Sequence, residues 1–112
     1  MDPSLDTEFA NGLKQTCPRH GGDPNIVQPF DPMTPFTFDN LYYQSLSKHQ
    51  GLLTSDQVLF DDNRTRALVQ LYEKNQTSFF DAFVSGMRKL QDIEVKTGQD
   101  GELRNDCSKF NS

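Results

Sequence analysis

Apolar residues recur at helical spacing in several stretches of this chain, and polar or proline- and glycine-rich segments separate these stretches. Near the N-terminus, Leu5, Phe9 and Leu13 follow one another at intervals of four residues. This spacing predicts an amphipathic helix over residues 3–16. Pro3 suits the first turn of that helix, where the backbone N–H that proline lacks has no partner anyway.

The rest of the pattern predicts four further helices, each with its own start signal. Their expected first residues are Asp39, Thr54 (in the capping-box pattern Thr54-x-x-Gln57), Asp62 or Asn63, and Thr77 or Ser78. Gly51 is expected to end the first of these helices. The last helix carries a broad apolar stripe, which we interpret as core packing: Phe79, Phe80, Phe83, Val84, Met87 and Leu90. The expected fold class is all-α.

A long irregular segment, residues 17–37, separates the first two predicted helices, and loops of that length in compact domains are usually functional. At its end, hard oxygen donors gather around two prolines: Asp31, Thr34, Thr37 and Asp39. Carboxylate, hydroxyl and carbonyl oxygens form the ligand set that Ca²⁺ prefers. From the residues alone, a proline-rich turn in which Asp39 only caps the next helix is an equally good interpretation.

Bulk properties narrow the class of protein. The length of 112 residues suits one domain, residues 1–112. The net charge of −5 and the pI near 4.8 argue against a nucleic-acid partner, which requires a basic face. No apolar run approaches membrane-spanning length, so a membrane partner is not expected. The first residues also lack the basic and apolar regions of a signal peptide.

Other features nevertheless suit a secreted protein. Asn63 and Asn75 each begin an N-glycosylation sequon, and there are two cysteines. A missing native N-terminus would reconcile these features with the lack of a signal peptide. By the chain-entropy argument, a bridge between Cys17 and Cys107 would contribute about 4 kcal/mol, because it would close a long loop.

Two motifs in order carry a family resemblance. Asp-x-x-Thr-Pro-x-x-Phe-Asp-Asn-x-Tyr-Tyr begins at Asp31, and Gly-Leu-Leu-Thr-Ser-Asp-Gln-x-Leu-Phe begins at Gly51. Together with Phe-Phe-x-Ala-Phe over residues 79–83 and Gly-Glu-Leu-Arg-x-x-Cys ending at Cys107, they resemble the C-terminal part of the secreted plant (class III) haem peroxidases. The resemblance covers nearly the whole chain. It implies the proximal helical portion of the haem-peroxidase fold, in incomplete form.

The resemblance also implies roles for individual residues. In that family the first motif is the proximal calcium loop, which would make Asp31, Thr34, Thr37 and Asp39 the calcium ligands. Asp56 would accept a hydrogen bond from the imidazole that ligates haem b, which raises the basicity of that ligand. Phe30 would pack against the same imidazole. Cys17 and Cys107 would each pair with a partner earlier in the chain rather than with each other.

The implied parent protein is a monomeric enzyme that reduces hydrogen peroxide and oxidises phenolic donors, located outside the cell, in the cell wall or in the vacuole. Neither an Arg-x-x-Phe-His-x-Cys nor a Gly-Ala-His-Thr segment occurs in the sequence. His20 and His49 lie in polar surroundings, unlike a haem ligand. We therefore expect both functional histidines to lie upstream of Met1, and the chain alone to be inactive. The alternative is a stand-alone helical calcium-binding or interaction module without redox activity.

Overall fold

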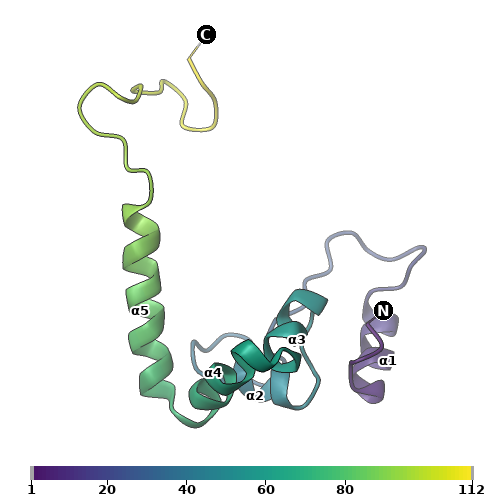
Figure 1. Cartoon of the computed structure of the whole chain (residues 1–112). Coiled ribbons are helices and arrows are strands. Elements are labelled where there is room, and N and C mark those ends of the chain that lie inside the picture. Colours follow the sequence, from purple (N-terminus) through teal and green to yellow (C-terminus); the bar gives the residue numbers. More distant parts are fainter. Residues whose placement is uncertain (1, 112) are drawn as a thin grey trace. The chain divides into compact units, whose positions relative to one another are not determined.

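The computed structural model describes residues 2–111, and all regular elements in that range are α-helices (Figure 1). They are α1 (Thr7–Thr16), α2 (Leu41–Ser47), α3 (Thr54–Asp61), α4 (Asn63–Lys74) and α5 (Gln76–Asp92). The predicted all-α fold is confirmed. The chain divides into two compact units, Met1–Asp81 and Ala82–Ser112, which are described separately below.

Helix α1 begins later than predicted. The Asp6 side chain accepts a hydrogen bond from the backbone N–H of Phe9 at 2.9 Å, which makes Asp6 the N-cap. The predicted start near Pro3 is therefore wrong, because a better capping residue follows it. The backbone N–H of Asp6 also donates to the carbonyl of His49 at 2.9 Å, which ties the start of α1 to the turn after α2.

The end of α2 is formed by His49 rather than by Gly51, so that prediction is also wrong. His49 adopts the left-handed conformation with φ of 57°. Its N–H donates to the carbonyl of Leu46 at 3.1 Å, and the N–H of Gln50 donates to the carbonyl of Ser45 at 2.9 Å. This pair of bonds is the Schellman arrangement, which satisfies the last carbonyls of a helix.

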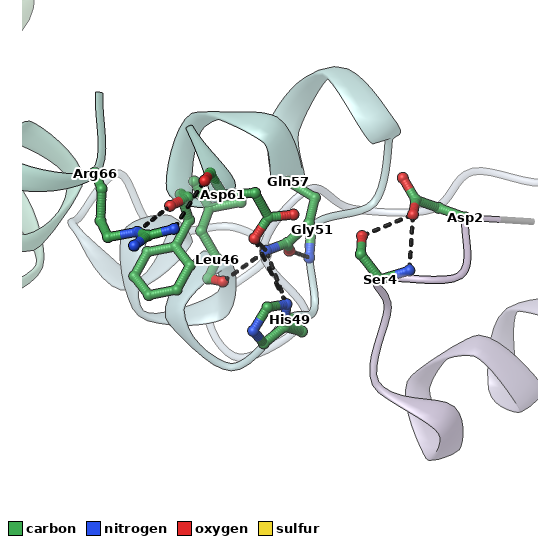
Figure 2. A network of polar contacts seen from close by, with 9 residues as sticks. Asp2, Ser4, Leu46, His49, Gly51, Gln57, Asp61 and Arg66 are labelled. Atoms are coloured by element: carbon green, nitrogen blue, oxygen red, sulfur yellow. Dashed lines mark hydrogen bonds and ion pairs between the residues drawn. The ribbon is translucent and has the colours of Figure 1, made fainter. Parts of the chain in front are cut away.

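Gly51 serves a different purpose, because it makes room for the buried side chain of Gln57 (Figure 2). The N–H of Gly51 donates to Oε1 of Gln57 at 3.1 Å, and Nε2 of Gln57 donates to the carbonyl of Leu46 at 3.1 Å. The predicted capping box at Thr54 is also wrong, because the N-cap residue of α3 is Leu53 and the Gln57 side chain is used in the bonds just described. Gln57 reaches back to the turn, and Asp56 instead accepts the N–H of Leu53 at 3.0 Å.

Replacing Gly51 with alanine is expected to destabilise the first unit by about 1–3 kcal/mol, the usual cost of overpacking. An added Cβ would lie 3.0 Å from the backbone N and Oε1 of Gln57 and from Cδ2 of Leu46. Urea unfolding followed by far-UV circular dichroism measures the change. The matched control is Gly12→Ala in α1, where a Cβ meets nothing within 4 Å and a gain of up to about 1 kcal/mol is expected. Equal unfolding midpoints for the two variants would contradict this account.

Helices α2, α3 and α4 pack against one another and form the centre of the first unit. Asn40, the buried residue before α2, donates from Nδ2 to the carbonyls of Tyr72 and Glu73, at 2.9 Å each. These carbonyls belong to the last turn of α4 and have no partner within the helix. Asn40 therefore fixes the start of α2 against the end of α4, beside an aromatic cluster that includes Tyr43, Tyr72 and Phe79.

Helices α4 and α5 begin at side-chain caps. Asp62 accepts the N–H of Arg64 at 2.8 Å, which confirms the predicted start of α4. Asn75 accepts the N–H of Ser78 at 3.0 Å, so α5 begins at Gln76, slightly earlier than predicted. Within residues 2–111, no helix is long and apolar enough to cross a membrane.

The interpretation of the apolar stripe of α5 as core packing holds for Phe79, which is buried in the first unit, and is wrong for the part of the stripe in the second unit. Val84, Met87 and Leu90 are 50%, 49% and 60% exposed. The segment after α5, residues 93–111, forms contacts between its own residues near the C-terminal end. Its contacts include a hydrogen bond of 2.9 Å from Nδ2 of Asn111 to the carbonyl of Leu103 and the Arg104 guanidinium 4.3 Å from the Phe110 ring centre.

Candidate calcium loop and the Asp56 carboxylate

The predicted calcium loop brings both of its carboxylates to one hydroxyl group. The Oγ1 atom of Thr34 lies 2.6 Å from Oδ2 of Asp31 and 2.9 Å from Oδ2 of Asp39. The remaining carboxylate oxygens accept backbone N–H groups, from Met33 at 2.8 Å and from Leu41 at 2.9 Å respectively. Two acidic side chains are thus fixed with one oxygen each directed at the same point.

This arrangement has more acceptors than donors. A threonine hydroxyl carries one proton, so it can donate to only one of the two carboxylates at a time. Neither Asp31 nor Asp39 has a basic side chain at ion-pair distance in the part of the chain that the structure describes. A cation would compensate both charges, and the donor set of carboxylate and hydroxyl oxygens fits Ca²⁺.

The N-cap residue of α2 is Asn40, one residue later than the predicted Asp39, but the Asp39 side chain still accepts a backbone N–H at the start of that helix. One oxygen accepts the N–H of Leu41 in α2, and the other faces Thr34. Thr37 is held close by the 3.0 Å bond from its N–H to the carbonyl of Thr34. Across residues 2–111, no group of three or more His, Cys, Asp or Glu side chains is placed to hold a metal. A calcium ion here would therefore depend on threonine and carbonyl oxygens as well as the two carboxylates.

The Asp56 carboxylate lies between α2 and α3. Oδ1 accepts a hydrogen bond of 2.9 Å from the hydroxyl of Tyr42, and Oδ2 accepts the 3.0 Å bond from the N–H of Leu53. A carboxylate offers about four acceptor positions, so roughly two are left for another donor. Asp56 is only partly buried and can therefore be reached by a donor from outside the described residues.

A family model described as peroxidase matches residues 1–75 of the chain. The chain belongs to the peroxidase family. Peroxidase 50 from Arabidopsis thaliana is 44% identical over 111 residues, which cover 99% of this chain and 33% of the relative. Peroxidase 16 from the same plant and cationic peroxidase SPC4 from Sorghum bicolor are each 45% identical over 99% of this chain. The matched regions make up 34% and 30% of those two relatives, respectively. The chain thus spans about a third of the length of the curated relatives it matches.

Two residues within the quoted motifs support the Asp56 region but were not predicted to do so. Tyr42 lies inside the quoted Asp-Asn-x-Tyr-Tyr motif, but nothing in that pattern indicates that its hydroxyl reaches Asp56. Gln57 lies directly after Asp56, and its burial fixes the first turn of α3 against the turn after α2. Both contacts depend on how α2 and α3 pack together, which the motifs themselves do not specify.

The surroundings of the Tyr42 hydroxyl raise its pKa. Burial raises its pKa first, and the hydrogen bond and charge of Asp56 raise it further. Burial also raises the pKa of Tyr43, with a smaller contribution from Tyr72. Because both folded-state values exceed the unfolded value of about 10, the neutral phenols stabilise the fold fully below that pH. The contribution is lost as the pH rises from about 10 through the higher folded-state values.

We therefore expect the helix content of the chain to fall as the pH is raised above about 10. A far-UV circular dichroism titration measures this loss. In the double variant with Tyr42→Phe and Tyr43→Phe, the alkaline transition should move to higher pH, because neither ring can then ionise. A transition at the same pH in both proteins would show that other groups control it.

The histidines and Phe30 make no contact with the carboxylates of Asp31, Asp39 or Asp56 in the hydrogen bonds and ion pairs of residues 2–111. His20 is exposed in the loop after α1. The Nδ1 atom of His49 lies 3.3 Å from Nε2 of Gln57 and 3.8 Å from Oδ1 of Asp61, so this ring supports the α2–α3 turn (Figure 2). Phe30, the predicted packing partner of the haem ligand, is 54% exposed, and nothing in the structure tests that role.

The predicted modification sites are all at the surface. Asn63 begins α4 and Asn75 follows it, and both are exposed. Cys17 ends α1 and Cys107 lies in the C-terminal segment; both are exposed, and neither forms a disulfide among the described residues. Glycosylation, and disulfides to partners elsewhere in a peroxidase, stay predictions.

Proposed function

We propose that this chain is the C-terminal third of a haem peroxidase and that it supplies the proximal calcium loop and the carboxylate partner of the haem ligand. The observation that carries the proposal is the convergence of Asp31 and Asp39 on the Thr34 hydroxyl, with no basic side chain to compensate them within residues 2–111. The order of the sequence motifs and the family membership support the same conclusion.

In this proposal the loop holds Ca²⁺ through its hard oxygens. The carboxylates of Asp31 and Asp39, the hydroxyl of Thr34 and the carbonyl of Thr37 supply part of the six to eight oxygens that calcium takes. Other oxygens, from water or from other segments, complete the shell. Because Asp39 is bonded to Leu41 at the start of α2, an ordered loop also fixes that helix.

Asp56 serves as the acceptor for the N–H of the imidazole that ligates haem b. A carboxylate in that position fixes the ring and raises its basicity. The Oδ1 and Oδ2 atoms each have one bonded donor and therefore keep acceptor capacity. Phe30 would cover the apolar side of the imidazole. When bound, the haem would supply the redox chemistry that reduces hydrogen peroxide and oxidises phenolic donors.

The parent enzyme is proposed to be a secreted monomeric glycoprotein. The exposed Asn63 and Asn75 would carry glycans. Cys17 and Cys107 would form disulfides with cysteines in the rest of the enzyme, which suits an oxidising compartment.

A fusion tests the proposal. The N-terminal two-thirds of Arabidopsis Peroxidase 50, the part outside the 33% that this chain covers, are joined to residues 1–112. We expect one bound haem per fusion and peroxide-dependent oxidation of a phenolic donor, with intact Peroxidase 50 as the positive control. A folded, haem-loaded fusion without this activity would overturn the proposal. Calcium binding by a fusion that takes up no haem would favour the alternative of a calcium-binding module.

A further inference from the structure

Tyr42 is the one side chain whose hydrogen bond links α2 to the Asp56 carboxylate among residues 2–111. Its hydroxyl donates to Oδ1 at 2.9 Å, while the N–H of Leu53 donates to Oδ2 at 3.0 Å. One donor comes from α2 and the other from the residue before α3. We propose that Tyr42 is a positioning residue that holds the Asp56 carboxylate in the orientation in which it accepts an imidazole N–H. This inference rests on the function proposed above.

The two donors together determine which way the carboxylate faces. With the Leu53 N–H alone, the side chain could still turn about its bonds and keep that contact. The second donor, on the other oxygen, fixes the plane of the carboxylate and leaves about one acceptor position on each oxygen. Tyr42 therefore sets the orientation in which Asp56 can accept a further donor.

Tyr42 is itself held by its surroundings. It lies in the first turn of α2, and its ring meets the ring of Tyr43 edge to face at a centroid distance of 5.3 Å. Tyr43 contacts Tyr72 at 5.2 Å and Phe79 at 5.0 Å in the same edge-to-face manner. The hydroxyl is thus presented to Asp56 by a packed aromatic cluster rather than by a mobile side chain.

The first test uses the whole chain and measures amide hydrogen exchange at Leu53. Tyr42→Phe keeps the ring and removes only the donor, so the Asp56 carboxylate should lose its fixed position and its bond to the Leu53 N–H should weaken. We expect exchange at Leu53 to accelerate by about three- to tenfold, the range of one ordinary hydrogen bond. Tyr43→Phe is the matched control and should leave that rate unchanged. Unchanged exchange in a Tyr42→Phe chain of normal helix content would overturn the proposal.

A second readout follows the phenol directly. Spectrophotometric titration of the whole chain should show the most alkaline phenol ionising at lower pH when Asp56 is replaced by asparagine, because the neighbouring charge is then removed. Asp61→Asn removes a charge elsewhere on α3 and should not move that titration. A Tyr42 titration that does not respond to Asp56→Asn would contradict the contact on which the inference depends.

The last readout separates this inference from the proposed function. In the Peroxidase 50 fusion, we expect Tyr42→Phe to raise the reduction potential of the bound haem, though less than the loss of the carboxylate does, because a carboxylate that is no longer held in place accepts the imidazole N–H less well and the imidazole becomes less basic. Asp56→Asn should raise the potential. A shift with Asp56→Asn and none with Tyr42→Phe overturns the role of Tyr42 and leaves the proposed function intact. No shift with either variant overturns the role of Asp56 and, with it, this inference.

Discussion

Replacing Asp31 and Asp39 together with asparagine is expected to weaken calcium binding by the chain at least about a hundredfold, because calcium affinity depends strongly on the charge of its ligands. Asparagine keeps the size of each side chain and one oxygen, so the loop loses charge without losing volume. The Thr34 hydroxyl can still meet both side chains, but no negative charge then converges on it. Isothermal titration calorimetry with Ca²⁺ measures the difference.

A control for net charge accompanies this experiment. The double replacement of Asp23 and Asp100 with asparagine removes the same amount of charge from exposed positions outside the loop. It should change calcium affinity little, because exposed charges at a distance are largely screened by salt. If the two double variants bind Ca²⁺ equally well, the loop is not the site.

Replacing Gln57 with leucine is expected to destabilise the first unit by about 2–4 kcal/mol, since a buried donor left without a partner costs about 1–3 kcal/mol and a second lost hydrogen bond costs about 1 kcal/mol. Leucine has a similar volume but no polar atoms, so the Gly51 N–H loses its partner and the Leu46 carbonyl keeps only the hydrogen bond from the His49 N–H. Gln57 has no exposed surface, which prevents water from replacing these bonds.

Urea unfolding followed by far-UV circular dichroism measures this loss. Gln70→Leu on the exposed face of α4 is the matched control, and we expect it to change stability by no more than about 0.5 kcal/mol. Similar unfolding midpoints for the two leucine variants would show that the buried amide does not stabilise the α2–α3 turn.

Local sequence patterns predicted that the chain is helical and where most of its helices lie, and they singled out the residues of the loop that is proposed to bind calcium. The apolar spacing around Leu13 and the capping residue Asp62 predicted elements that the structure contains. Asp31 and Asp39 were recognised because the relevant information, hard oxygens close together between prolines, lies within a few consecutive residues. Their convergence on Thr34 needs only a local turn.

Features that depend on distant contacts could not be predicted in this way. Asn40 bonds to carbonyls at Tyr72 and Glu73, more than thirty residues away, and Gln57 is buried only because α2 and α3 meet. Glycine is the usual left-handed residue at a helix end, which led to the wrong assignment of Gly51 in place of His49. The spacing of the α5 stripe shows that an apolar face exists, but spacing cannot identify what covers that face.

The central claim is that Asp56 of this chain serves as the partner of a haem-ligating imidazole in a peroxidase. The most direct measurement is the rate of peroxide-dependent phenol oxidation per bound haem in the Peroxidase 50 fusion, with and without Asp56→Asn. We expect this replacement to lower the rate by about ten- to a hundredfold, the usual effect of removing such an outer partner. Asp61→Asn, the same change at the end of the same helix, should leave the rate unchanged. Equal rates for the Asp56→Asn and unmodified fusions, at equal haem content, would contradict the claim.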